Sequence, residues 1–267
     1  MSARSDETRR RREAIAERIQ RTGSAFTADI CREFGVSEVT ARADLAALEQ
    51  KGALRRIRGG AVSPPKTVAI SYPAEREEEH LEAKRAIGRA GARLVHDGDV
   101  ALLDTGTTTL QLARELRDKV GTVIVTADVA IASYASLNLP RVSTVLLPGR
   151  LWPGRLCLTG PAVRERLADI YADIAFLHAD LIDGEGGCWT ELEPDARTKR
   201  LLMDHAPRRF LLADASKFHD GPVGGGLHRF ASLEEFDALI CEREPWAGRD
   251  SVPDAATRTV TMVAPSR

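Results

Sequence analysis

Residues 27–61 read TADICREFGVSEVTARADLAALEQKGALRRIRGGA, and this stretch decides the fold of the N-terminal part of the chain. Apolar residues at a spacing of three and four predict a short helix over residues 27–34, which Thr27 can cap and Gly35 ends. Ser37 is well placed to cap a second helix from residue 38 to about residue 50. Two short helices joined by so tight a turn predict a helix-turn-helix.

The second helix is expected to bury its apolar residues and to expose the polar ones near its N-terminus. The expected buried residues are Val39, Ala43, Leu45, Ala46 and Leu48. The expected exposed residues are Glu38, Thr40, Ala41, Arg42 and Asp44. In a helix-turn-helix, this end of the second helix meets base edges.

A basic wing of two strands is expected to follow. Gly52 closes the second helix, and residues 53–58 predict a short strand before the turn Gly59-Gly60. Arginines in such a strand straddle phosphates or enter a minor groove. The expected DNA-binding residues are therefore Ser37, Glu38, Thr40, Ala41, Arg42, Arg55, Arg56 and Arg58. The alternative is a three-helix packing module with solvated arginines; the agreement of turn, cap, basic residues and wing favours DNA binding.

The charge distribution agrees with this interpretation. Residues 1–60 hold 13 Lys plus Arg and 9 Asp plus Glu, a balance of +4, whereas the remaining 207 residues have 25 against 30, a balance of −5. The run Arg9–Arg12 either lies on the DNA backbone or begins a solvated helix, and the sequence does not decide between the two. So small a surplus predicts weak binding by one copy, and hence a homo-oligomer, a dimer or tetramer, that pairs two half-sites of double-stranded operator DNA.

Length and composition restrict the remaining possibilities. A chain of 267 residues with 43% hydrophobic content suits about two domains of roughly 150 residues or less. Neither a signal peptide nor a membrane span is expected, so the predicted location is the cytoplasm. The four cysteines are far apart and the histidines do not cluster, so no metal site, disulfide framework or cofactor is expected.

The predicted domains are a winged helix-turn-helix over residues 1–62, a linker over 63–80, a second domain over 81–247 and a C-terminal tail over 248–267. A helix at about 77–95 leads into the second domain, where apolar runs of strand length alternate with helical patterns. The expected strands are 100–104, 122–126, 142–147, 174–177 and 209–213, and the helices between or after them are 110–116, 129–137, 163–170 and 195–205. Such alternation predicts a largely parallel α/β sheet covered on both faces.

The turn after the first of these strands is the candidate ligand site. Gly106 permits a tight turn, and Thr107, Thr108 and Thr109 offer hydroxyl and N–H groups at a helix start, where an anion is favoured. The alternative is that the threonines only cap the helix. Asp104 suits a hydroxyl beside a phosphate. Lysine is scarce, so Lys199 and Lys217 are further candidates, although each is alternatively a solvated surface cation.

Several motifs in one order resemble the DeoR family of bacterial sugar-metabolism repressors over about residues 5–242. They are VSEVTARADLAALEQKGALRRIRGGA, DGDVALLDTGTTTLQLA, VIVTAD, Gly160-Pro161, DIAFLHADLID, TKR and LLADASKF. The resemblance implies a winged helix-turn-helix joined to a sensor domain similar in fold to ribose-5-phosphate isomerase and CoA transferases. It also implies a bound phosphorylated sugar or related metabolite. The implied ligand residues are Asp104, Gly106, Thr107, Thr108, Thr109, Asp180, Lys199 and Lys217, and Ser37, Thr40 and Arg42 match the recognition helix.

The chain departs from the family pattern at several positions. Ala43 stands where the family has a second arginine before Asp-Leu, and Arg58 where it often has histidine. His178 and Leu181 replace glycines close to the expected pocket; His178 is read either as a ligand contact or as a structural residue. Arg150 and Arg155 are read either as anion contacts or as surface residues.

The expected function is a transcriptional repressor of carbohydrate-metabolism genes whose operator affinity a phosphorylated sugar controls, without enzymatic activity. One alternative is an isomerase-type enzyme with an accessory DNA-binding domain, in which Asp104, Asp180, Asp183 and Glu185 supply bases. Another is an architectural DNA binder without a ligand.

Overall fold

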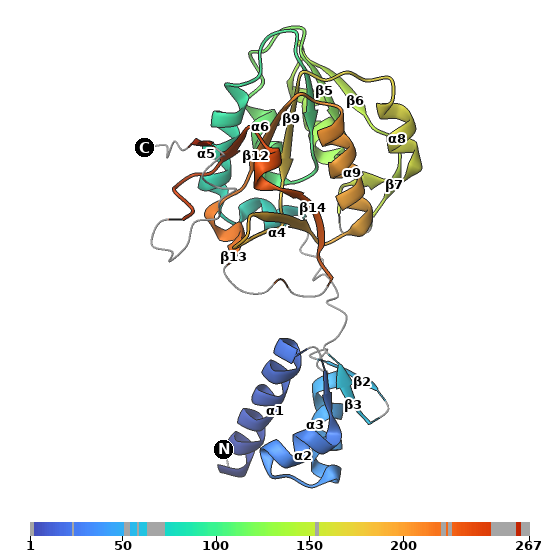
Figure 1. Ribbon diagram of the computed structural model, residues 1–267, viewed down its shortest axis with the longest axis vertical. Helices are drawn as coiled ribbons and strands as arrows, with labels where there is room; N and C mark the ends of the chain where they lie inside the picture. The colour runs from blue at the N-terminus through green and yellow to red at the C-terminus, as the bar shows by residue number, and fades with distance from the viewer. Residues whose placement is uncertain are drawn as a thin grey trace. The chain divides into compact units, whose positions relative to one another are not determined.

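The chain divides into two units, Met1–Ala69 and Ile70–Arg267, which are described one at a time (Figure 1). The computed structural model describes residues 3–22, 24–50, 54–57, 59–62, 73–152, 155–219, 223, 226–246 and 260–262. None of the helices within these residues is long and apolar enough to cross a membrane.

Unit 1 contains three helices and a small sheet. The helices are α1 (Ala3–Thr22), α2 (Thr27–Phe34) and α3 (Glu38–Gln50), and the strands are β1 (Ser24–Phe26), β2 (Arg55–Ile57) and β3 (Gly60–Val62). The bounds of α2 and α3 agree with the sequence prediction, and Gly35 ends α2 in a left-handed conformation with φ of 61°. The hydroxyl of Ser37 accepts the N–H of Thr40 at 3.2 Å, as expected of a cap.

The start of α2 differs from the prediction. Phe26, not Thr27, is the N-cap residue of α2. Thr27 is buried, and its N–H donates to the carbonyl of Gly59 at 2.8 Å. The predicted cap at Thr27 is therefore wrong, because the chain enters α2 directly from β1 and ties that junction to the wing turn.

The predicted faces of α3 are also partly wrong. Ala41 and Asp44 are buried, at 0% and 1% exposure, whereas Val39 is 79% exposed and Ala43 is exposed too. The helix is rich in alanine on every side, so its apolar pattern did not identify one face. Packing against α1 and α2 instead selects residues 41, 44, 45 and 48.

Asp44 explains part of the arginine run in α1. The Nε atoms of Arg11 and Arg12 each lie 2.7 Å from a carboxylate oxygen of Asp44. These two side chains therefore join α1 to α3, which neither reading of the sequence anticipated. Asp44 is an internal acceptor rather than part of an exposed face.

The wing gains a third strand. Strands β1, β3 and β2 form an antiparallel sheet in that order, where the sequence predicted two strands. A Cβ on Gly60 would lie 2.3 Å from the carbonyl oxygen of Ala25, so glycine is needed for β1 to approach β3. The predicted roles of Gly52, Ala53 and Arg58 lie outside the described residues.

Unit 2 is built on a parallel sheet of seven strands in the order β16-β15-β12-β9-β4-β5-β6. They are β4 (Val100–Leu103), β5 (Val123–Thr126), β6 (Ser143–Leu146), β9 (Ile174–His178), β12 (Arg208–Leu212), β15 (Ala238–Ile240) and β16 (Val260–Met262). Every pairing in it is parallel. The first five strands in chain order are those predicted, whereas β16 lies within the predicted C-terminal tail.

Alternate residues of these strands enter two separate cores, because successive side chains of a strand point to opposite faces. One face packs on α5 (Leu81–Ala92), α6 (Thr107–Arg114) and α7 (Val129–Asn138), through a core that includes Leu103 and Phe176. The other face packs on α8 (Pro161–Leu167) and α9 (Glu193–Asp204), through a core that includes Leu102 and Leu177. The prediction of a parallel α/β sheet is confirmed.

A second sheet and the start of the unit were not predicted. Strands β10 (Leu181–Asp183), β11 (Gly187–Thr190), β13 (Phe218–His219) and β14 (His228–Ser232) form a mixed sheet in the order β13-β10-β11-β14, and β7 (Arg150–Leu151) pairs with β8 (Leu158–Thr159). The helix expected over 77–95 is instead two helices, α4 (Pro73–Glu78) and α5, separated at His80, whose φ is 53°. The predicted linker 63–80 thus includes a helix of unit 2.

Candidate functional site

The residues predicted to contact DNA lie mostly on the exposed side of α3. Ser37, Glu38 and Arg42 are exposed and Thr40 is half-buried. Arg42 donates to the carboxylate of Glu38 at 2.5 Å, one turn earlier on the same face. Ala41 is the exception, because its methyl group belongs to the core and is not available to a base edge.

The wing contributes Arg56, whose exposed guanidinium lies 4.0 Å from the carboxylate of Glu49. Arg55 is in β2, but its side chain, like the whole of Arg58, lies outside the described residues. Within the described residues, the candidate DNA-contacting surface therefore consists of the exposed residues of α3 together with Arg56.

The topology of unit 2 creates a crevice at one edge of the parallel sheet. From β4 the chain continues to β5 and β6 on one side, and later to β9, β12, β15 and β16 on the other. Helices and loops diverge where the order reverses, so ligands bind beyond the carboxyl ends of such strands. Here those ends are Asp104–Gly106 after β4 and His178–Asp180 after β9.

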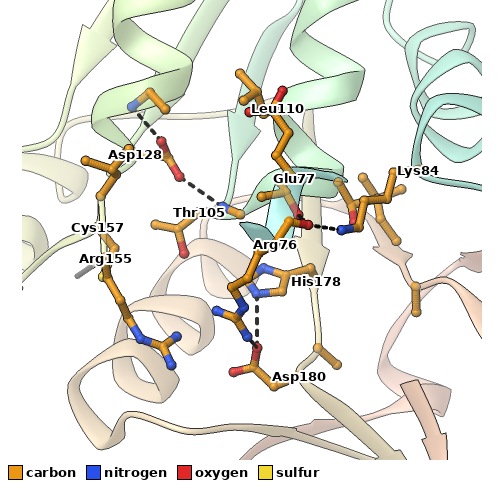
Figure 2. Close-up of a pocket in the computed structure, with 18 of the residues that line it drawn as sticks. Arg76, Glu77, Lys84, Thr105, Leu110, Asp128, Arg155, Cys157, His178 and Asp180 are labelled. Carbon is orange, nitrogen blue, oxygen red and sulfur yellow. Dashed lines mark hydrogen bonds and ion pairs between the residues drawn. The ribbon is translucent and has the colours of Figure 1, made fainter. Parts of the chain in front are cut away.

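A pocket occupies this crevice (Figure 2). The charged and polar side chains that line it are Arg76, Glu77, Glu79, Lys84, Thr105, Thr107, Thr108, Asp128, Arg155, Cys157, His178, Asp180, Asp195 and Lys217. Figure 2 shows Lys84 on one side of the pocket and Asp128, Cys157 and Arg155 on the other, with Arg76 and His178 between them. Cys157 is inert as a nucleophile, because burial raises the pKa of its thiol to about 12.

Beneath the pocket lies a buried ionic cluster. The Nζ atom of Lys199, which is 0% exposed, donates to Asp104 and lies 3.0 Å from Nδ1 of His178 and 3.6 Å from Asp195. Nδ1 of His178 is 2.9 Å from the same Asp104 oxygen. The cluster joins the ends of β4 and β9 to α9, so it fixes the floor of the pocket.

Burial and pairing oppose each other in this cluster. Burial would raise the pKa of Asp104, but Lys199 and then His178 lower it to about 2. Burial would lower the pKa of Lys199, but Asp104 and Asp195 raise it. For Asp195 burial prevails and raises the pKa. Asp104 and Lys199 therefore form a charged pair, and neither is available to a ligand.

The turn after β4 requires glycine at position 106. Gly106 has φ of 128°, and a Cβ there would lie 3.1 Å from the His178 ring, so only glycine fits. Its N–H donates to Asp128 at 2.9 Å, and the same carboxylate caps α7. Burial raises the pKa of Asp128 although these amide donors lower it. The N–H groups that begin α6, at Thr107 and Thr108, face no intrahelical acceptor.

Two lysines on the wall of the pocket lack carboxylate partners. Arg76 pairs with Asp180 and Arg155 with Glu191, whereas Lys84 and Lys217 form no ion pair with any described residue. Lys84 is only 4% exposed, and burial lowers its pKa; the charge of Asp214 opposes this lowering, whereas Lys217 adds to it. Its ammonium donates instead to the backbone carbonyl of Arg76.

Helix α4 is fastened to the pocket through Arg76. Its guanidinium lies 3.1 Å from Asp180, and its carbonyl accepts both Lys84 and, at 3.4 Å, the hydroxyl of Thr107. Glu77 adds an ion pair to Arg114 of α6 at 2.6 Å. With His178 and other neighbours, Arg76 lowers the pKa of the buried Asp180 below its ordinary value.

The structure brings together part of the predicted ligand set. Gly106, Thr107, Thr108, Asp180 and Lys217 line the pocket. Three predictions need correction, since Asp104 and Lys199 bind each other beneath the pocket, and Thr109 is buried with its hydroxyl donating to the carbonyl of Gly106 at 2.8 Å. His178 is both a pocket residue and part of the buried cluster. Arg155 lines the pocket, whereas Arg150 is exposed on β7.

Sequence reasoning missed Arg76, Lys84 and Asp128. The scarcity of lysine was the signal that could have identified Lys84, because it is one of only 6 lysines beside 32 arginines. Arg76 was hidden in a charged run interpreted as linker. Asp128 ends the motif VIVTAD, and its position after a strand was the available signal.

Comparison with known proteins identifies the chain. A winged helix-turn-helix and an α/β unit with a pocket together define the class of DNA-binding transcription regulators. Residues 11–67 match the DeoR-like helix-turn-helix domain, and residues 79–243 match the DeoR C terminal sensor domain. The chain therefore belongs to the DeoR family. Its matched domains and its relatives are those of transcription regulators and not of enzymes, which favours the regulator over the isomerase-type alternative.

Three relatives illustrate the similarity. The chain is 33% identical to the HTH-type transcriptional repressor GlcR of Bacillus subtilis (strain 168), over 87% of each protein. It is 31% identical to a putative aga operon transcriptional repressor of Escherichia coli O157:H7, over 88% of this chain and 86% of that protein. It is 26% identical to a lactose phosphotransferase system repressor of Staphylococcus epidermidis, over 91% of this chain and 95% of that protein.

Among solved structures, the chain is similar in part to ribose 5-phosphate isomerase A of Methanocaldococcus jannaschii. The sequence identity is 20%, the match covers 51% of this chain and 53% of that chain, and the TM-score is 0.38.

Proposed function

We propose that the pocket binds a phosphorylated sugar or a related anionic metabolite, and that this ligand controls the affinity of the chain for operator DNA. Lys84 is the observation that carries the proposal. Its ammonium group is buried beside Lys217 and forms no ion pair with any described residue; the carboxylates of Asp214 and Glu79 raise its pKa only from beyond ion-pair distance. A buried cation without a close counter-ion is costly, and a bound anion reduces that cost.

The chemistry of the pocket supports one orientation of the ligand. The phosphate binds at Lys84 and Lys217, where the first N–H groups of α6 and the hydroxyls of Thr107 and Thr108 add donors. The sugar extends past His178 toward Arg155, which lies on the side of the pocket opposite Lys84 (Figure 2). Two charge-bearing lysines at one end favour a phosphorylated ligand over a neutral sugar.

The names of two relatives agree with such a ligand, because one refers to the aga operon and another to the lactose phosphotransferase system. We therefore propose a repressor of carbohydrate-metabolism genes that acts in the cytoplasm. A homo-oligomer, a dimer or tetramer, presents two winged helix-turn-helix modules to an operator with two half-sites.

The test is a titration of the full chain against labelled DNA from upstream of its own gene, with an unrelated duplex as competitor. A panel of pentose and hexose phosphates is added, each beside its unphosphorylated sugar. We expect one sugar phosphate to change the operator affinity and its free sugar to leave it unchanged. If no sugar phosphate changes the affinity while specific binding persists, the proposed ligand class is wrong.

A substitution connects that response to the pocket. Lys84→Met should weaken binding of the effective sugar phosphate at least tenfold, because it removes the unpaired cation while keeping the length of the side chain. Lys119→Met is the matched control, since Lys119 also donates to a backbone carbonyl but lies outside the pocket lining. Equal ligand affinity in both variants would contradict the assignment of the phosphate to Lys84.

A further inference from the structure

The exposed face of α3 carries an apolar strip within a polar surface. Val39 is 79% exposed, and Ala43, one turn later on the same side, is exposed as well. The core of unit 1 takes Ala41, Leu45 and Leu48 from this helix and neither residue of the strip. A β-branched residue is also a poor helix former, so neither packing nor helix propensity accounts for valine at this position.

The position of Val39 relates the strip to DNA. Val39 is the second residue of α3, directly after the capped start at Ser37, and the N-terminal residues of a recognition helix are those that reach base edges. Arg42 lies one turn further along and is held by Glu38 on the neighbouring flank. The apolar strip therefore lies beside the polar groups that are best placed to read bases.

The major groove offers one apolar group for such a strip, the C5-methyl group of thymine. We propose that Val39, with Ala43 beside it, contacts a thymine methyl group in each operator half-site, and that Val39 is thereby a specificity-determining residue. The proposal rests on the DNA-binding function of the family and does not depend on the ligand. Arg42 supplies the polar contact of the same helix end, since a guanidinium suits the acceptors of guanine.

Replacing thymine with uracil tests the contact, because the two bases differ only by that methyl group. Duplexes that the full-length protein prefers are first selected from a random library, and each thymine of the chosen duplex is then changed to uracil. For the wild type we expect about a fourfold loss of affinity at one position of a half-site, the value of one buried methyl group. Substituting both half-sites should cost about fifteenfold.

The Val39→Ala variant and the thymine-to-uracil change together form a double-mutant cycle. The variant should bind the thymine and uracil duplexes within twofold of each other, because the apolar partner of the methyl group is gone. Truncation of so exposed a side chain leaves the fold intact, which circular dichroism checks. Val120→Ala, the same truncation at a valine of unit 2 that is 44% exposed, should keep the full discrimination of the wild type.

Three results would overturn the proposal. One is a wild type that is insensitive to uracil at every thymine position. Another is a Val39→Ala variant that keeps the wild-type discrimination, or that loses affinity equally for selected and unrelated duplexes. A protein that selects no preferred duplex would refute sequence reading by α3 altogether, whereas failure of the sugar-phosphate titration alone would leave this proposal standing.

Discussion

Asp44 is a buried carboxylate that accepts a hydrogen bond from each of two arginines, so its replacement tests how unit 1 is held together. Asp44→Ala leaves Arg11 and Arg12 without their acceptor and should lower the free energy of unfolding of unit 1 by about 2 to 4 kcal/mol. Urea unfolding followed by circular dichroism measures this. The three tryptophans, all in unit 2, report whether that unit is unchanged.

Asp29→Ala is the control for this change, because among the described residues Asp29 pairs only with Arg32, one turn away at 3.4 Å, and the Arg32 side chain is 79% exposed. It should cost less than about 1 kcal/mol. Similar losses in the two variants would mean that the contact between α1 and α3 through Asp44 stabilises little.

The pair of Asp104 with Lys199 predicts a pH dependence of unit 2. Because the pKa of Asp104 is about 2 in the folded chain, against 3.8 ordinarily, the folded state binds this proton less tightly than the unfolded state. The carboxylate therefore stabilises unit 2 above pH 4, and its contribution of about 2 kcal/mol is lost as the pH falls from about 4 to about 2.

Tryptophan fluorescence during urea unfolding measures this effect for the wild type and Asp104→Asn. We expect the difference in unfolding free energy between them to be smaller at pH 3 than at pH 6, because at pH 3 the unfolded wild type mostly holds this proton and must release it to form the charged pair. A difference that is equal at both pH values would show that folding does not lower the pKa of Asp104.

Individual residues show which features of the site could be predicted from the sequence and which could not. The glycine and threonines after β4 were predicted as a ligand site because their chemistry is local, and Gly106, Thr107 and Thr108 line the pocket. The burial of Asp104 and Lys199 was not, because it depends on the pairing of elements whose residues are 95 positions apart. Local sequence therefore suggested that both residues face the ligand, whereas tertiary packing makes them partners of each other.

At the scale of elements, helix α4 is the part of unit 2 that we expect ligand binding to disturb. Two of the groups that we propose bind the phosphate, Lys84 and Thr107, both donate to the carbonyl of Arg76. A phosphate that recruits them competes with that carbonyl and loosens α4. Since α4 is the first described helix after the wing in the chain, we expect its release to affect DNA binding.

Arg76→Ala tests this role of α4. It removes the ion pair to Asp180, so we expect the sugar phosphate still to bind, within about tenfold, while its effect on operator affinity falls to less than half. Calorimetry measures ligand binding and a gel shift measures the DNA response. Arg85→Ala, which breaks only an exposed pair with Glu82 on α5, should leave both unchanged. A full DNA response in Arg76→Ala would exclude α4 as the coupling element.

Helices and strands were predictable where burial on one or both faces produced a clear hydrophobic pattern. Strands β4, β5, β9 and β12 are short apolar runs inside the sheet, and β6 is a similar run at its edge, so the hydrophobic pattern identified all five. The strands β10, β11 and β13 have two to four residues each. β10 and β11 form a short hairpin, but β13 and β14 join it from far along the chain, so little local signal marks this sheet. The bounds of helix α3 were predicted correctly, but its buried face was not, because alanine occurs on all sides of the helix.

At the scale of the whole molecule, the ligand and the operator must influence each other reciprocally. If the sugar phosphate weakens operator binding by some factor, thermodynamic linkage requires that the operator weaken sugar-phosphate binding by the same factor, which is commonly about 5- to 150-fold. The ratio of the two operator dissociation constants, with and without ligand, should therefore equal the ratio of the ligand constants with and without operator duplex.

Calorimetric titration of the ligand into the free protein and into the complex with operator measures the second ratio, and a gel shift at the same salt concentration measures the first. Salt must be matched because phosphate contacts make DNA affinity fall steeply with ionic strength. If the two ratios differ at a low protein concentration and agree at a higher one, the ligand acts by changing the oligomeric state. Ratios that stay unequal at every concentration would mean that the sugar phosphate also binds the DNA-contacting surface, and that the pocket of unit 2 is not the only site of control.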